Sequence, residues 1–241
     1  MKKIYAMVLS HNCCDLLPVA IEKIPKDYFY KIFITDDGST DNTLEVIKKL
    51  KIDLTNSTKI GYGANVMHGL NYAFDLGADY VVEIHGDGAQ FNPNAIIPAL
   101  KYIESDHDFI IGSRFINIKK TLELKIPYPR FIANIMLSAI DKSILKLPFT
   151  EFHTGFRIYG KKFKNINFKN NSTDYLFSFE VIAQAAFNNF RCAEVPVECD
   201  YISDHTSHSY FGATLYAIKH FFVLKDYIIS KYTKIKLGVF K

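Results

Sequence analysis

The sequence predicts an α/β fold in which a mostly parallel central sheet is flanked by helices. Over residues 1–115, short apolar runs alternate with segments whose apolar residues recur at helical spacing. Chains that alternate strand and helix in this way form parallel sheets, because each helix returns the chain to the same end of the sheet. Acidic or polar residues follow several of the apolar runs, at the edge where such sheets bind ligands. The 241 residues are enough to bury a sizeable core.

The first predicted strand covers residues 3–10 and ends at Ser10. Its apolar run is too short for a signal peptide with a cleavage site, so we expect it to be part of the folded chain. A helix follows, because apolar residues then recur at helical spacing. These residues are Leu16, Leu17, Ala20, Ile21 and Ile24.

Two further strand and helix pairs come next. Residues 31–36 form the second predicted strand, and the helix after it ends in several lysines, the charge that favours a helix C-terminus. Residues 52–55 form a short third strand. The helix after that strand opens at Gly61-Tyr62-Gly63, where two glycines allow close backbone approach. Such a helix start can bind phosphate or sugar oxygens, although for two glycines alone a plain turn is the favoured explanation.

The fourth and fifth predicted strands are residues 79–84 and 108–112, with Pro93 beginning the helix between them. Beyond residue 115 the regular alternation stops. The remaining predicted elements are helices at residues 131–147, 177–187 and 213–230, and a strand at residues 191–200.

The composition excludes several classes of protein. Hydrophobic residues make up 49% and charged residues 22% of the chain, which is typical of a globular protein and argues against disorder. The four cysteines form no C-x-x-C pair, so we expect neither a disulfide framework nor a zinc site, and a reducing compartment fits best. No apolar run is long enough to span a bilayer. The net charge of +4 lies mostly in the C-terminal tail, and we find no basic groove typical of nucleic-acid binding.

Two adjacent carboxylates, Asp36 and Asp37, end the second strand ahead of Gly38. Ser39 or Asp41 alone is explained by capping of the next helix, but a cap does not require both preceding acids. A second acid, Asp87, follows the fourth strand within His85-Gly86-Asp87. We therefore expect an electropositive or donor-rich ligand at this edge of the sheet.

Five segments in order and spacing resemble family 2 glycosyltransferases of the GT-A fold, with the dolichol-phosphate mannosyltransferase-like branch most similar. The resemblance covers about residues 4–222. The segments are Asp36-Asp37-Gly38-Ser39-Thr40-Asp41, Gly61-Tyr62-Gly63-Ala64-Asn65, His85-Gly86-Asp87-Gly88-Ala89-Gln90, Gly112-Ser113-Arg114 and His153-Thr154-Gly155-Phe156-Arg157.

The resemblance implies a nucleotide-sugar donor, a divalent cation such as Mg²⁺ or Mn²⁺, and transfer of a hexosyl group with inversion. It assigns Asp87 to the metal, with His85, Gln90 and His208 as further candidate ligands. Carboxylate and phosphate oxygens suit these cations. His85 stands where the family has an acid, and Ala89 is an insertion before Gln90. His85 and His208 are each explained equally well as loop histidines without a ligand role.

For the nucleotide sugar, the resemblance implies recognition by Ser10, Asp36, Asp37 and Gly63, together with His85, Arg114 and His208. Arg114 and Arg157 are candidates for holding phosphate oxygens, because a planar guanidinium matches phosphate geometry. The alternative for each arginine is an ion pair with a carboxylate. Glu151 is a candidate general base toward an acceptor hydroxyl, but a lipid phosphate is already anionic and needs no base. Asp87, Glu151 and Arg157 are thus the candidate catalytic residues.

We expect a single domain over residues 1–241. Residues 1–115 form the predicted nucleotide-sugar-binding half, residues 116–212 the acceptor side, and residues 213–241 a basic amphipathic helix. This helix could lie on an anionic membrane surface or simply pack on the core. We expect a cytoplasmic protein, peripheral on the inner face of a membrane in the first case.

The sequence therefore predicts a metal-dependent, inverting hexosyltransferase of glycan or polysaccharide assembly, with a saccharide or polyprenyl-phosphate acceptor. Two alternatives remain open. A catalytically weakened nucleotide-sugar-binding or scaffolding subunit would account for His85 and the Ala89 insertion. A sugar-1-phosphate nucleotidyltransferase would need a glycine-rich phosphate loop after the first strand, and Ser10-His11-Asn12 is not one.

Overall fold

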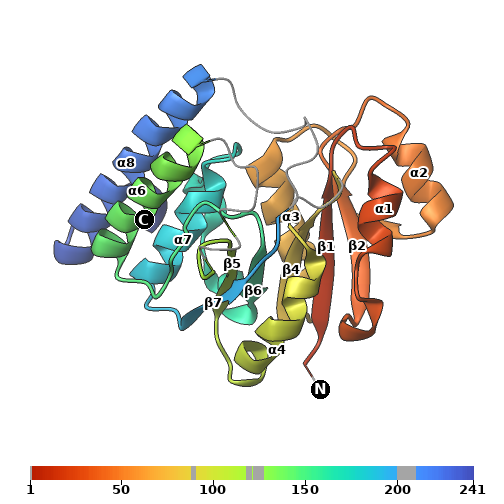
Figure 1. Ribbon diagram of the computed structural model, residues 1–241, viewed down its shortest axis with the longest axis horizontal. Coiled ribbons are helices and arrows are strands. Elements are labelled where there is room, and N and C mark those ends of the chain that lie inside the picture. The colour runs from red at the N-terminus through yellow and green to blue at the C-terminus, as the bar shows by residue number, and fades with distance from the viewer. Residues whose placement is uncertain (1, 88–90, 118–120, 122–127, 200–209) are drawn as a thin grey trace.

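The computed structural model describes residues 2–87, 91–117, 121, 128–199 and 210–241. It contains a seven-stranded sheet with helices on both faces, so the predicted α/β class is confirmed (Figure 1). The strands are β1 (Ile4–Ser10), β2 (Lys31–Asp36), β3 (Asp53–Leu54), β4 (Tyr80–His85), β5 (Phe109–Ser113), β6 (Arg157–Gly160) and β7 (Cys192–Pro196). The α-helices are α1 (Leu17–Glu22), α2 (Thr43–Leu50), α3 (Tyr62–Asp75), α4 (Ile96–Glu104), α6 (Tyr128–Leu145), α7 (Phe177–Phe187) and α8 (Tyr210–Tyr232).

The strand order is β3-β2-β1-β4-β6-β5-β7. β6 pairs antiparallel with β4 and β5, whereas the other neighbouring strands pair parallel. β6 has no counterpart among the predicted strands, because four residues directly after a polar cluster carry too short an apolar pattern to indicate one. The predicted strand over residues 191–200 is shorter in the structure and pairs with β5 as β7.

Alternate residues of β1 point into two separate hydrophobic layers. Tyr5, Met7 and Leu9 pack with α3, α7 and α8, whereas Ile4, Ala6 and Val8 pack with α1, α2 and α4. All seven residues of β1 are buried, as expected for a central parallel strand covered on both faces. The sheet is therefore rigidly held, and its carboxyl edge is a fixed platform for polar side chains.

Helices α6 and α8 lie side by side at the outer flank of α7 (Figure 1). Both carry exposed apolar side chains, as on α8 at Ile218, Phe221 and Phe222. Within the part of the chain that the structure describes, no helix has the length and apolar character needed to cross a membrane.

Candidate functional site

The carboxyl ends of β1, β2 and β4 bring polar residues from distant parts of the chain to one edge. Ser10 pairs with Asp36 across β1 and β2, and Leu9 pairs with His85 across β1 and β4. The order of strands reverses between β1 and β4, and this is where open α/β sheets bind ligands. Because β6 is antiparallel, its first residue, Arg157, lies at the same edge, opposite Glu83.

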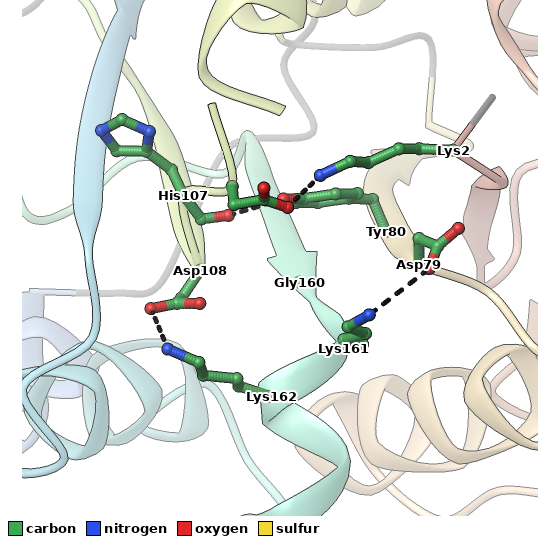
Figure 2. Close-up of a pocket in the computed structure, with 9 residues that line it drawn as sticks. Lys2, Asp79, Tyr80, His107, Asp108, Gly160, Lys161 and Lys162 are labelled. Atoms are coloured by element: carbon green, nitrogen blue, oxygen red, sulfur yellow. Dashed lines mark hydrogen bonds and ion pairs between the residues drawn. The ribbon is translucent and has the colours of Figure 1, made fainter. Parts of the chain in front are cut away.

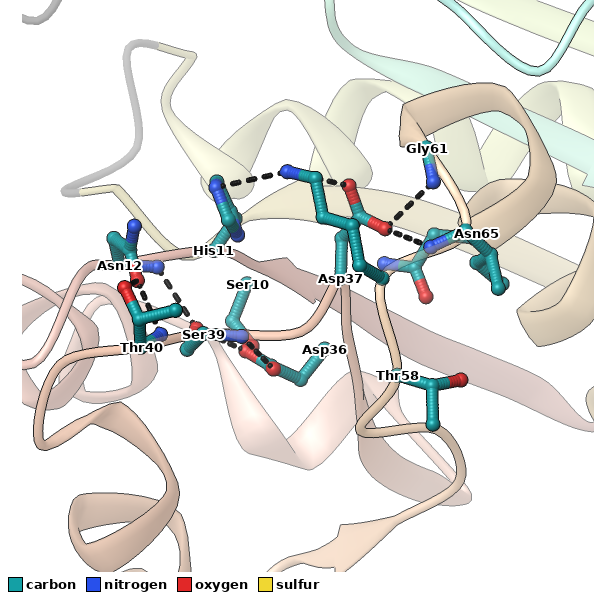
Figure 3. Close-up of polar contacts among 12 residues, drawn as sticks. Ser10, His11, Asn12, Asp36, Asp37, Ser39, Thr40, Thr58, Gly61 and Asn65 are labelled. Atoms are coloured by element: carbon teal, nitrogen blue, oxygen red, sulfur yellow. Dashed lines mark hydrogen bonds and ion pairs between the residues drawn. The ribbon is translucent and has the colours of Figure 1, made fainter.

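Asp36 is fully buried and is held by two serines (Figure 3). Its Oδ1 accepts hydrogen bonds from Ser10 Oγ at 2.7 Å and from Ser39 Oγ at 2.6 Å, and its Oδ2 accepts from the Ser39 backbone N–H at 2.7 Å. Buried carboxylates are stabilised by such donors. The hydrogen bonds of Asp36 to Ser10 and Ser39 thus fix the turn after β2.

Asp37 holds the loop that leads into α3 (Figure 3). Its Oδ1 accepts from the backbone N–H groups of Ile60 and Gly61, both at 2.7 Å, while its Oδ2 lies 3.5 Å from Lys59 Nζ. Gly61 has φ +90°, which a residue with a Cβ rarely adopts. The Lys59 side chain is largely exposed, so a ligand could displace it from Asp37 Oδ2.

His85 and Asp87 lie at the end of β4 and in the turn after it. His85 Nε2 and Asp87 Oδ1 are buried and have no hydrogen-bond partner among the described residues. Burial would lower the pKa of His85, but the carboxylates of Glu83 and Asp87 raise it above its usual value. A buried carboxylate oxygen and an imidazole nitrogen without hydrogen bonds are suitable ligands for a divalent cation. Gln90 and His208, the other predicted ligands, lie outside the described residues.

A buried cluster around Glu83 supports this edge. Its Oε1 accepts from Tyr62 Oη at 2.6 Å and its Oε2 from Tyr159 Oη at 2.7 Å, and Arg157 Nη1 lies 3.5 Å from Oε1. Burial alone would raise the pKa of Glu83, but Arg157, His85 and the hydrogen bonds lower it to about 2. The sequence reading missed Glu83. The available signal was a charged residue inside an otherwise apolar strand, two positions before His85.

Both candidate phosphate-binding arginines are in buried ion pairs, which is the alternative that the sequence left open. Arg157 contacts Glu83 and also donates to the carbonyl of Thr154. Arg114 donates from its backbone N–H to Glu151 Oε2 and from Nε to Glu151 Oε1, both at 2.7 Å.

Glu151 is fully buried, and both of its oxygens accept from Arg114. A general base must reach the hydroxyl from which it takes a proton. In this structure Glu151 instead positions Arg114 behind the end of β5, so the predicted general-base role is not supported by its geometry.

Gly63 is explained by close packing. Its backbone N–H donates to the Thr173 carbonyl at 2.8 Å, and a Cβ at this position would lie 2.7 Å from the Phe177 Cβ. The glycine therefore does not require a ligand.

Tyr175 is a half-exposed aromatic residue that the sequence reading also missed. Its ring stacks on Tyr62 with centroids 4.8 Å apart. Partial burial raises its pKa, and so do the negative charges of Asp87 and Asp37. Tyr175 thus forms an aromatic border beside the two candidate binding acids.

A hollow of about 440 Å³ lies at the opposite edge of the sheet, near the start of β4 and the end of β6 (Figure 2). Its cations face carboxylates, since Lys162 Nζ lies 3.0 Å from Asp108 Oδ2 and Lys161 Nζ lies 4.0 Å from Asp79 Oδ1. These pairs neutralise one another, so the hollow offers no concentrated charge for a ligand.

Comparison with known proteins identifies a family and several relatives of this chain. The family model described as "Glycosyl transferase family 2" matches residues 5–175. A UDP-N-acetylglucosamine–dolichyl-phosphate N-acetylglucosaminyltransferase from Methanococcus voltae is 26% identical, over 83% of this chain and 86% of that protein. A polyprenol monophosphomannose synthase from Mycolicibacterium smegmatis is 23% identical, over 69% of this chain and 65% of that protein.

Solved structures with the same fold include glucosyl-3-phosphoglycerate synthase from Mycobacterium tuberculosis. The complex with UDP has a TM-score of 0.67 and 13% identity, and covers 95% of this chain and 80% of that chain. The complex with Mn²⁺ and UDP-glucose has a TM-score of 0.63 and 11% identity, with coverage of 95% and 79%. At this identity the likeness concerns the fold alone, and it confirms the fold class expected from the sequence.

Proposed function

The chain belongs to family 2 of the glycosyl transferases, and from this premise we propose that it transfers a hexosyl group from a UDP- or GDP-sugar to a polyprenyl phosphate, with inversion at the anomeric carbon. The observation that carries the proposal is a pair of buried atoms at the end of β4 that make no hydrogen bond to any residue the structure describes. His85 Nε2 and Asp87 Oδ1 lie at the strand edge where the sheet order reverses, beside Tyr175 and Asp37.

Asp87 and His85 fit a divalent cation, because Asp87 Oδ1 and His85 Nε2 are buried and neither has a hydrogen-bond partner among the described residues. His85 Nε2 lies 3.4 Å from Glu83 Oε1, which would hold the imidazole at this edge. We assign Asp87 and His85 to the cation, with Gln90 and His208 as proposed additional ligands. When bound, Mg²⁺ or Mn²⁺ would neutralise charge that develops on the leaving nucleoside diphosphate. Binding of a cation requires neutral His85, so its raised pKa means that protons compete with the metal.

Asp37 is the proposed acceptor for the nucleoside. Its Oδ1 is fixed by two backbone N–H groups, which orient Oδ2 toward the exposed Lys59 side chain. A base N–H or ribose hydroxyl could replace the lysine as the partner of Oδ2. Tyr175 supplies an aromatic face at the same place. Ser10 and Asp36 contribute by fixing the turn that carries Asp37.

Arg157 and Arg114 are proposed to act as fixed positive charges behind the diphosphate. Glu83 holds Arg157, and Glu151 holds Arg114, so neither guanidinium has to be ordered when the donor binds. Preorganised charges of this kind stabilise a transition state without reorganisation. Arg157 and Glu83 also position Tyr62 and His85.

The burial of Glu151 favours a phosphate acceptor over a saccharide hydroxyl. A hydroxyl has to lose a proton to a base, whereas a lipid phosphate is already anionic. The relatives named for dolichyl phosphate and for polyprenol monophosphomannose support the same class of acceptor. The exposed apolar side chains of α8, including Ile218 and Phe222, offer a surface for a lipid or for the face of a membrane.

The test is a transfer assay with the purified chain. UDP-N-acetylglucosamine, UDP-glucose and GDP-mannose are each incubated with dolichyl phosphate in detergent, with Mn²⁺, Mg²⁺ or chelator. We expect metal-dependent formation of one glycosyl phosphate, with the anomeric configuration inverted in the NMR spectrum.

Asp87→Ala should lower the rate of sugar transfer by at least about 100-fold, because the loss of a single group that stabilises charge in a transition state typically has an effect of this size. The matched control is Asp75→Ala, which removes an exposed acid at the far end of α3. Undiminished transfer by Asp87→Ala would refute the assignment of this site. If the parent binds UDP or GDP with metal but turns over no donor and acceptor pair, the scaffolding alternative is favoured instead.

A further inference from the structure

Three potential metal ligands from separate parts of the chain meet in the interior beside α7, and none of them is among the residues assigned to the donor. Asp141 comes from α6, His220 from α8, and His153 from the segment before β6. The Asp141 and His220 side chains are fully buried, and the His153 side chain is 11% exposed. No motif in the sequence relates these three positions.

The ligand atoms of the cluster converge. His220 Nε2 lies 2.8 Å from Asp141 Oδ1, and His153 Nε2 lies 3.2 Å from Asp141 Oδ2. One ligand atom from each of the three residues lies within 4.8 Å of the others, so a single first-row metal ion could reach all three after small shifts of the side chains.

The same atoms lack hydrogen bonds. Both oxygens of Asp141 and the Nε2 atoms of His153 and His220 are buried without a hydrogen-bond partner among the described residues. A buried carboxylate without such partners is strongly destabilising unless a cation compensates it. Protonated imidazoles at these distances would also compensate the carboxylate and lower its pKa, so a carboxylate and imidazolium ion pair is the alternative to a bound metal.

We propose that Asp141, His153 and His220 form a second divalent metal site, independent of the donor site and suited to Zn²⁺. Two imidazoles and one carboxylate are a ligand set that Zn²⁺ binds, with the fourth position left to water or to the second oxygen of Asp141.

The surroundings suit such a site. The Phe179 ring lies 4.0 Å from the His220 ring, centroid to centroid, and covers one side of the cluster. Tyr216 Oη lies 3.5 Å from His153 Nδ1, where a contact to the nitrogen that does not ligate would orient the ring.

The site would be structural. It joins α6 and α8 to the segment that continues through Thr154 to Arg157, whose guanidinium is part of the donor edge. Metal binding would therefore hold the two outer helices against the body of the protein, and metal loss should loosen them first.

The experiment uses the full chain with the Asp87→Ala substitution, so that the proposed donor site does not contribute. The protein is stripped with chelator and titrated with Zn²⁺ by calorimetry, without nucleotide. We expect one equivalent to bind and the Tm to rise. Co²⁺ in place of Zn²⁺ should give the visible absorption of a tetrahedral site.

Asp141→Asn and His220→Ala, each in this background, should abolish the equivalent. His68→Ala, which removes an exposed histidine on α3, should leave it unchanged. If His220→Ala does not fold, His153→Ala at the less buried position serves the same purpose. The proposal is overturned if the Asp87→Ala protein binds no Zn²⁺, or if the Asp141→Asn and His220→Ala variants bind Zn²⁺ as tightly as the Asp87→Ala protein does. The three side chains would then form an ion pair between a carboxylate and an imidazolium.

Discussion

Glu83→Gln tests how the buried cluster supports the donor edge. The substitution keeps the size of the side chain but removes the charge that faces Arg157. It also replaces one of the two oxygens that accept hydrogen bonds from the Tyr62 and Tyr159 hydroxyls by an amide NH₂ group. The pKa of Glu83 falls from its ordinary value of 4.5 to about 2 in the folded chain. This difference corresponds to about 3 kcal/mol of stabilisation at neutral pH. Leaving one partner of a buried ion pair alone costs about 3–5 kcal/mol, which agrees.

The assay is urea unfolding at pH 7, followed by circular dichroism, without nucleotide or added metal. We expect Glu83→Gln to lower the free energy of unfolding by about 3 kcal/mol, a large part of the ~5–15 kcal/mol typical of a domain. Adding Arg157→Met to Glu83→Gln should recover part of the loss, because no charge is then left unpaired. A loss below about 1 kcal/mol for Glu83→Gln would refute the reasoning that this pair is energetically coupled.

The same carboxylate sets an expected pH dependence. Its folded pKa is depressed, so its stabilisation is fully present above about pH 4.5 and is lost as the pH falls toward 2. The parent should therefore lose stability faster than Glu83→Gln over this interval. Parallel acid limbs in the two unfolding curves would contradict the assigned pKa.

Three further predictions concern binding, packing and the lipid surface. Asp37→Asn should weaken UDP or GDP binding by about 10-fold in calorimetry, because it removes a charged acceptor but keeps an oxygen for the loop N–H groups. Unchanged affinity would exclude Asp37 from the donor site. Gly155→Ala should destabilise the chain by about 1–3 kcal/mol in urea unfolding. The added Cβ would lie 3.3 Å from His85 Nε2 and still closer to the Phe91 ring. Wild-type stability would show that the His85 and Phe91 side chains can move away without cost. Phe222→Ser should reduce co-sedimentation with anionic vesicles, because this side chain is 57% exposed; equal binding would assign the apolar face of α8 to another partner.

Several elements and candidate residues were predictable from local sequence. The alternation of apolar runs and helical segments predicts β1, β2, β4 and the parallel part of the sheet, because a strand buried on both faces must be apolar throughout. Asp37 and Asp87 were placed at the carboxyl edge for the same reason, since each directly follows such a run.

The partners of the buried charged residues were not predictable in this way. Glu83 meets Arg157 only because β6 inserts antiparallel beside β4, and Glu151 meets Arg114 only because the chain returns to the end of β5. The sequence left each arginine open between a phosphate and a carboxylate. In the structure each arginine lies against a carboxylate, and its proposed role toward the diphosphate stays a prediction.

The sequence by itself thus determined the fold class, the family and the edge at which the donor acids stand, because these depend on the local periodicity and order of residues. Tertiary structure alone decided which acids are held internally, as Asp36 and Glu151 are, and which have an oxygen without a hydrogen bond among the described residues, as Asp87 does. It also brought together Asp141, His153 and His220, whose positions in the chain are far apart. The physical reason is that burial and electrostatic pairing depend on the distance between groups in space, not on their separation along the chain.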